Sequence, residues 1–211
     1  MKGVEPGEWR AVQSEGYVML DVRPQEEVDR AAVVGSVHVP LYMTDDDPSL
    51  AGLLKQLTNT FAGFGWWLGG SHMKMNAAFL NDVQAKLPDK GAKVLVACQK
   101  GLRSLKACEQ LVRAGYSNVA WLSGGYDAAK KGDFDTVNGK DIRYGGAGGV
   151  SALIGWTKVQ QEEDRAMGGG VLKVLGYVAV FAVINILSIA WQAWGEYSVT
   201  GKLPDGLPRI L

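Results

Sequence analysis

The sequence predicts an α/β fold with a parallel sheet flanked by helices on both faces, followed by one C-terminal transmembrane helix. Two observations carry this prediction. Short apolar segments alternate with helical patterns between residues 17 and 122, and parallel neighbouring strands need crossover helices of this kind. From Val174 to Trp194 the chain has 21 residues without a charged side chain. As a helix, this run would cover about 30 Å, the thickness of the hydrocarbon core of a bilayer.

The N-terminal part of the predicted domain reads as strand, helix and strand. The first strand runs from Tyr17 to Leu20 and ends at Asp21. Pro24 fits the first turn of a helix, and the acids that follow it suit the helix dipole. Residues 31–40, "AAVVGSVHVP", form the next strand region, which stops at the proline.

An insertion interrupts this alternation between residues 44 and 75. The stretch "LAGLLKQLTNTF" (50–61) has the apolar spacing of a helix, and "FAGFGWWLGGSH" (61–72) reads as a glycine-rich and aromatic loop. Trp66 and Trp67 in this loop are expected to pack over an edge of the core. Two alternatives stay open for them, a lid beside an active site and a foot on a membrane surface, where tryptophan is favoured.

The second half of the domain continues with helices and strands. A helix capped by Asn76 comes first, and the apolar strand 93–97 follows it. A helix over 102–114 and the strand "NVAWL" (118–122) complete the pattern. Functional sites in parallel sheets lie at the carboxyl ends of the strands. Cys98, directly after its strand, therefore marks the candidate site.

Composition and cysteine spacing exclude several classes of function. The 22 basic and 22 acidic side chains cancel, so no net field favours nucleic acid as a partner. Cys98 and Cys108 lie ten residues apart and match neither a redox pair nor a zinc motif. We therefore expect no metal and no disulfide framework, and we assign no cofactor. Cys108 shares a helix face with Leu105, Leu111 and Val112 and is expected in the core.

The candidate chemistry lies in residues 98–104, "CQKGLRS". A cysteine between a strand and a helix N-terminus places its sulfur where loop N–H groups converge, and these groups stabilise a thiolate. Arg103 adds a positive charge, and Gly101 permits the reversal of the chain. Ser104 can bond an N–H at the helix start or the sulfur itself. The alternative for Cys98 is a small buried residue at a strand end.

At these residues the chain resembles the rhodanese (sulfurtransferase) family, whose single-domain members carry Cys-x-x-Gly-x-Arg-Ser. Upstream, "LDVRPQEEV" resembles the early Asp-x-Arg box of that family, and "VVGSVHVP" is similar to its second box in a degraded form. Downstream, "GYSNVAWLSGGYDA" resembles its closing signature. The order and spacing of all four agree from Val18 to Ala128. The resemblance implies a rhodanese-like parallel sheet and sulfur transfer.

The resemblance also implies roles for individual residues. Cys98 would be catalytic: it attacks the outer sulfur of a donor such as thiosulfate, carries that sulfur as a persulfide, and passes it to a thiol acceptor. Substrate binding falls to the rest of the loop: Gln99, Lys100, Gly101, Leu102, Arg103 and Ser104. Lys100 matches the loop lysine of thiosulfate-using members. Related cysteine phosphatases place five residues between cysteine and arginine, so the four found here favour sulfur over phosphate. Asp21 and Arg23 would support the site as a structural ion pair near the sheet end.

The predicted organisation has four parts. These are a rhodanese-like domain over residues 1–137 with its insertion at 44–75, a glycine-rich connecting arm over 138–172, a transmembrane helix over 173–195 and a short tail over 196–211. Lipid contact is expected through residues 174–194, with aromatic anchors near both ends of the helix. A core helix of a soluble protein is the alternative.

The insertion, the glycine-rich segment and the span together resemble the membrane-bound rhodanese-like proteins of chloroplasts. This implies a single-pass protein with its domain in the stroma and its anchor in the thylakoid, and it allows a membrane protein complex as a partner. Basic residues near the span favour the same orientation by a margin of one charge. Two functions are compatible with these features: a tethered sulfurtransferase, or a non-catalytic docking module beside a membrane complex.

Overall fold

The computed structural model describes residues 1–168 and 170–200. The chain divides into two compact units, Met1–Val159 and Gln160–Leu211.

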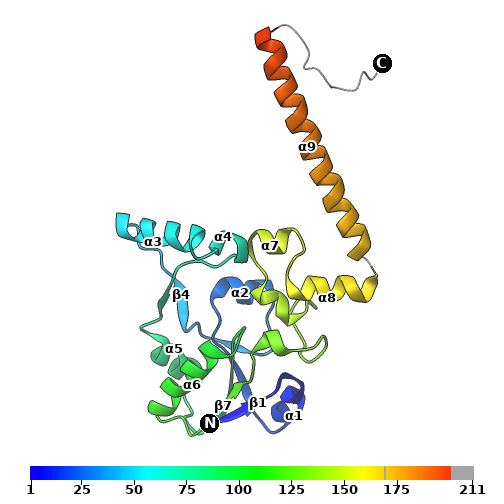
Figure 1. Ribbon diagram of the computed structural model, residues 1–211. Helices are drawn as coiled ribbons and strands as arrows, with labels where there is room; N and C mark the ends of the chain where they lie inside the picture. Colours follow the sequence, from blue (N-terminus) through cyan, green and yellow to red (C-terminus); the bar gives the residue numbers. More distant parts are fainter. Residues whose placement is uncertain (169, 201–211) are drawn as a thin grey trace. The chain divides into compact units, whose positions relative to one another are not determined.

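A five-stranded sheet forms the centre of the first unit (Figure 1). Its order is β1 (Lys2–Val4), β7 (Asn118–Leu122), β6 (Lys93–Ala97), β2 (Val18–Asp21) and β3 (Val37–His38). All four neighbouring pairs are parallel. The predicted strands are therefore present, and β1 is an addition that the sequence did not suggest. The central position of β6 explains its continuous apolar run, because both of its faces are covered.

Two hydrophobic clusters cover the two faces of this sheet. Successive strand residues point to opposite faces, so Leu95 joins one cluster while Val94 and Val96 join the other. The first cluster receives α1 (Trp9–Ser14), and the second receives α5 (Phe79–Lys86) and α6 (Leu102–Arg113). This confirms the predicted α/β class with helices on both faces of a parallel sheet.

The insertion holds more regular structure than the sequence predicted. After α2 (Gln25–Arg30), β4 (Tyr42–Thr44) and β5 (Met73–Met75) pair antiparallel and bracket α3 (Leu50–Phe61) and α4 (Gly65–Leu68). The helix α3 was predicted, whereas α4 lies inside the expected loop. Phe64 enters α4 with a left-handed backbone at φ 53°, a conformation that sequence patterns rarely indicate.

The expected cap of α5 is shifted by two residues. Asn76 lies before the helix, and its side-chain oxygen accepts a hydrogen bond from the Ala78 N–H at 2.9 Å. An asparagine can close a turn on the backbone two residues ahead as readily as it can cap a helix. Asn76 therefore shapes the turn that leads into α5.

The glycine-rich segment packs inside the first unit, which runs to Val159. It forms η3 (Ile142–Gly146) and α7 (Gly149–Leu153), and α7 lies beside α4 (Figure 1). A Cβ on Gly149 would lie 2.5 Å from the Gly69 nitrogen, so these glycines allow two backbones to approach. The first part of the predicted connecting arm over 138–172 therefore packs within the first unit, and the domain boundary at 137 stays a prediction.

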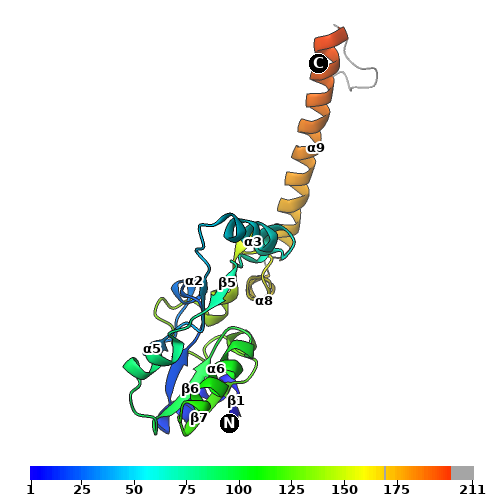
Figure 2. The same cartoon turned by 90° about the vertical axis from the view of Figure 1, so that its left-hand side faces the viewer.

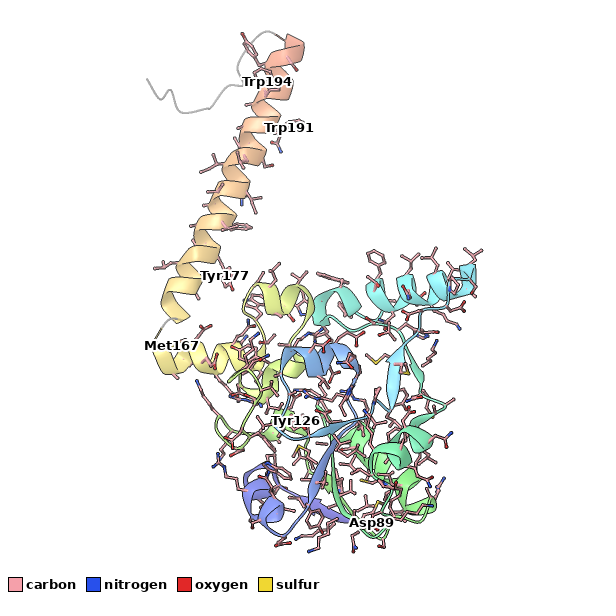
Figure 3. The ribbon with its side chains drawn as sticks, turned by 180° about the vertical axis from the view of Figure 1, so that it is seen from behind. Asp89, Tyr126, Met167, Tyr177, Trp191 and Trp194 are labelled. Atoms are coloured by element: carbon pink, nitrogen blue, oxygen red, sulfur yellow. The ribbon has the colours of Figure 1, made fainter. Side chains whose placement is uncertain are left out.

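The second unit contains most of α8 (Lys158–Met167) and the long helix α9 (Gly170–Thr200). Within α9, Val174–Gly195 has a mean hydropathy of 2.2 and is long and apolar enough to cross a membrane. Tyr177 lies near the start of this stretch, and Trp191 and Trp194 lie near its end (Figure 3). The predicted tail from 196 continues α9 to Thr200, and its remainder lies outside the described residues.

Candidate functional site

The candidate site is built where β6 ends and α6 begins. Cys98 directly follows the strand, and Gly101 stands immediately before the first residue of α6 with φ 89°. A Cβ at Gly101 would meet the Gly124 nitrogen and the Trp121 ring at 3.3 Å. Both the backbone conformation and the space therefore favour glycine here, and they hold the loop in a tight reversal.

The Cys98 sulfur faces the N-terminus of α6. The N–H groups of Gly101 and Ser104 donate to Cys98 Sγ at 3.1 and 3.3 Å. The Ser104 hydroxyl donates to the Gly101 carbonyl oxygen at 2.7 Å and accepts from the Cys98 thiol at 3.5 Å. Two amide donors at a helix N-terminus stabilise negative charge on this sulfur, as the sequence suggested.

The other loop residues predicted to bind substrate differ in where their side chains lie. Gln99 turns inward: its amide nitrogen donates to Asp127 Oδ1 at 2.6 Å and to the Arg143 carbonyl oxygen at 3.1 Å. The Gln99 side chain thereby ties the loop to two later segments. Lys100 lines a cavity, and Leu102 is an exposed residue at the start of α6.

Arg103 is held by an acid that sequence reasoning placed only at a helix start. Its guanidinium donates to Glu27 Oε1 and Oε2 at 2.9 and 2.8 Å. Burial lowers the pKa of Arg103, but the hydrogen bonds and charge of Glu27 outweigh it and raise the pKa above its ordinary value. The two residues lie 76 positions apart, so no local sequence signal could have paired them.

Asp21 and Arg23 form the predicted ion pair, and both are fully buried. Arg23 Nη2 lies 2.7 Å from Asp21 Oδ2, and Arg23 Nη1 donates to Gln99 Oε1 at 3.1 Å. The guanidinium also lies 4.4 Å from the centre of the Tyr126 ring, which Figure 3 shows inside the domain. Burial lowers the pKa of Arg23, yet the Asp21 carboxylate keeps this pKa above its ordinary value. This buried network connects the end of β2 to the cysteine loop.

Tyr126 is a site residue that sequence reasoning missed. Its hydroxyl lies 3.4 Å from Asp21 Oδ2. Burial, followed by the negative charge of Asp21, raises the pKa of Tyr126 well above its ordinary value. Its backbone N–H donates to the Cys98 carbonyl oxygen at 3.0 Å, so Tyr126 holds the backbone at the start of the cysteine loop. The only sequence signal was its place directly after two glycines in the closing signature.

A cavity of about 310 Å³ lies beside the loop, and Lys100 is part of its wall. Its other lining residues include two aromatic and two cationic side chains: Trp67, Trp156, Arg143 and Lys158. Trp67 packs edge-to-face on Trp156, with ring centres 5.8 Å apart. Trp67 therefore lies beside the candidate site, which is where one of the two alternatives placed it.

The second cysteine is in a different environment. Cys108 is fully buried and lies 3.5 Å from the Ala120 carbonyl oxygen. Burial raises the pKa of the Cys108 thiol to about 12. The core placement of Cys108 and Leu111 is confirmed, but Val112 is 45% exposed. The buried arc of α6 centres on residues 104 to 111, which leaves Val112 at its edge.

The chain is similar in sequence to several known proteins. Rhodanese-like domain-containing protein 11, chloroplastic, of Arabidopsis thaliana is 37% identical over 190 residues, which are 89% of this chain and 64% of the relative. Rhodanese-like domain-containing protein 10 of the same plant is 42% identical and covers 73% of this chain and 72% of its own length. The chain thus spans less than two thirds of the length of the first relative.

Thiosulfate sulfurtransferase 16, chloroplastic, of Arabidopsis thaliana is 31% identical over 57% of this chain and 80% of its own length. Among solved structures, a human single-domain sulfurtransferase is 20% identical, covers 61% of this chain and 94% of its own, and superposes with a TM-score of 0.37. The family model described as "Rhodanese-like domain" matches residues 8–131. This match covers more than half of the sequence and includes the cysteine loop, so the chain belongs to the rhodanese-like domain family.

Proposed function

We propose that this protein is a thiosulfate-type sulfurtransferase that carries sulfane sulfur as a persulfide on Cys98 and is anchored in a membrane by α9. The observation that carries this proposal is the position of Cys98 Sγ, which accepts hydrogen bonds from the N–H groups of Gly101 and Ser104 at the start of α6. Membership of the family supports a sulfurtransferase-type function in general, and two relatives carry the name thiosulfate sulfurtransferase.

The proposed reaction has two displacements at sulfur. After a local opening that admits solvent and donor, the Cys98 thiol loses its proton to solvent, and the thiolate attacks the outer sulfur of thiosulfate. The sulfur–sulfur bond of the donor breaks, and sulfite leaves with the electron pair. An acceptor thiolate then attacks the outer sulfur of the persulfide, and the bond to Cys98 breaks to restore the Cys98 thiolate. No net oxidant is needed, and the loop amides stabilise each sulfur anion.

Two features of the loop favour sulfur over an oxyanion substrate. Four residues separate Cys98 from Arg103, one fewer than in the related phosphatases. Both oxygens of Glu27 already accept hydrogen bonds from the Arg103 guanidinium, and an oxyanion bound there would have to displace them. Lys100 lines the adjacent cavity and would give an anionic donor its positive partner.

The proposed location is the thylakoid membrane, with the domain on the stromal side. It rests on the apolar stretch Val174–Gly195 and on relatives whose names include the word chloroplastic. Trp191 and Trp194 near one end of that stretch suit a membrane interface.

A non-catalytic docking module is the second candidate. One observation favours it: Cys98 is fully buried, so a donor reaches its sulfur only after a local opening. In that case the protein would bind partners, with a membrane protein complex as the first class to test, and it would not turn over.

Sulfur transfer from thiosulfate to cyanide by the full chain in mild detergent tests the proposal. We expect the purified wild-type protein to carry the added mass of one sulfur atom. Cys98→Ala should lose both this added mass and turnover. Cys108→Ala is the matched control, because this second buried thiol, with its high pKa, should contribute nothing. Equal activity in wild type and Cys98→Ala would rule out the sulfurtransferase proposal for this donor and favour the docking module.

A further inference from the structure

The helix α3 exposes its apolar side. Five apolar residues recur along one stripe at helical spacing and are between 44% and 73% exposed: Leu50, Leu53, Leu54, Leu57 and Phe61. An amphipathic helix of a soluble domain normally turns such a stripe toward the core. We call these five residues the α3 stripe.

The polar side of α3 is the side that is attached to the domain. The Gln56 amide donates to the Asp45 carbonyl oxygen at 2.9 Å, and the Asn59 amide donates to the Gly70 carbonyl oxygen at 2.8 Å. Gly52, also on this side, is buried against the Asp47 backbone. The orientation of α3 is therefore fixed by specific contacts that point the α3 stripe outward.

The apolar surface continues beyond α3. Phe64, Trp66 and Leu68 around α4 are 45% to 60% exposed, and α4 follows α3 in the chain and lies at its C-terminal end (Figure 1). Figure 2 shows α3 beyond β5, on the side away from β6 and β7. From Leu50 to Gly70 the sequence contains a single charged residue, Lys55. An exposed apolar surface of this extent marks an interaction site, and its lack of charge suits hydrocarbon better than a strongly charged partner.

The length of the chain makes a bilayer the occupant that the observations favour. Fourteen residues, 160–173, separate the first compact unit from the apolar stretch that begins at Val174. A fully extended chain of that length reaches about 50 Å. The reach is shorter because α8 is helical as far as Met167. If α9 spans a membrane, the α3 stripe is held near that membrane at a high effective concentration.

We propose that the α3 stripe rests in the headgroup region of the bilayer, so that the domain lies on the membrane surface. The tether argument rests on the proposed anchoring by α9, whereas the outward stripe does not. Interfacial helices of this kind sink roughly 5–10 Å into the boundary between headgroups and acyl chains. Because the stripe carries no basic residues, contact with uncharged lipid should suffice and should change little with salt.

Two neighbouring positions on α3 provide the test. The full chain is reconstituted into phosphatidylcholine vesicles with a nitroxide spin label on Leu54→Cys, in the stripe, or on Lys55→Cys, outside the stripe. Both labelled variants also carry Cys98→Ala and Cys108→Ala, so that the label attaches only at the position under test. We expect collisions with oxygen, which dissolves in lipid, to exceed collisions with a water-soluble nickel chelate several-fold at position 54. The order should reverse at position 55.

Each outcome decides the proposal. A label at position 54 that collides mainly with the nickel chelate overturns it. A label shielded from both reagents also overturns it, because protein would then cover the stripe. Leu57→Cys repeats the measurement if Leu54→Cys does not fold. A label on Ile184→Cys, in the middle of α9, reports separately on the span, so failure of the anchor and failure of the stripe are distinguishable without any sulfur-transfer assay.

Discussion

Two regions of the first compact unit reverse the usual distribution of polar and apolar side chains. Beneath the cysteine loop, Arg23 and Asp21 are fully buried. Along α3, apolar side chains from Leu50 to Phe61 are exposed while the polar side is attached to the domain. Each arrangement costs free energy relative to the ordinary one.

The two regions differ in whether residues of this chain supply the partners for the unusually placed side chains. The buried region is complete: among the described residues, no buried side-chain nitrogen or oxygen lacks a hydrogen-bond partner. The Arg23 side chain contacts four residues: Asp21, Ala31, Gln99 and the ring of Tyr126. Such a network positions a loop and needs nothing from outside. The exposed region has apolar surface that an external partner would cover, so it points to an interface.

The largest effect is expected from breaking the buried network. Arg23→Met would leave the Asp21 carboxylate buried without its partner, and the free energy of unfolding should fall by about 3–5 kcal/mol. Urea unfolding of the full chain in mild detergent, followed by near-UV circular dichroism, measures this loss. The double variant Asp21→Asn, Arg23→Met is the control, and it should be more stable than the single variant because no charge is left unpaired. Equal losses in the two variants would contradict a coupled pair.

An intermediate effect is expected where the glycine-rich segment meets the same network. A Cβ at Gly146 would lie 2.7 Å from Cγ of Gln99, whose side chain is buried and hydrogen-bonded. Gly146→Ala should therefore lower the free energy of unfolding by roughly 1–3 kcal/mol and reduce sulfur transfer by shifting the loop. Gly7→Ala is a matched control, since nothing lies within 4 Å of its added methyl group. A Gly146 variant as stable and active as the control would show that this segment does not constrain the loop.

The sequence predicted those parts of the fold that depend on local pattern. The strand Lys93–Ala97 and the helix after it lie where predicted, because a buried strand and an amphipathic helix leave clear apolar periods. The position of Cys98 followed from the rule that sites lie at carboxyl ends of parallel strands. The pairing of Arg103 with Glu27 and the inward turn of Gln99 could not be predicted, because they join residues far apart in the chain.

Two features of the first unit lie beyond what local sequence patterns can predict. The glycines of residues 138–172 predict a connecting arm, and in the first part of that segment Gly149 allows a close contact with Gly69. The period of α3 predicted an amphipathic helix, but periodicity does not say which face is attached to the domain. Composition and periodicity describe what a segment can do, whereas tertiary contacts decide which option is used.

The smallest effect on stability is expected on α3, and it sharpens the contrast with the interior. Leu57→Gln changes an exposed side chain, so the free energy of unfolding in detergent should change by no more than about 0.5 kcal/mol. Leu111→Gln, at a fully buried leucine of α6, is the matched control and should cost several-fold more. The same Leu57→Gln variant should weaken contact between α3 and phosphatidylcholine vesicles, seen as fewer oxygen collisions at a label on position 54. A large loss of stability for Leu57→Gln would instead mean that the α3 stripe is covered within the protein. The stripe would then belong to the protein interior and would not be an interface for an external partner.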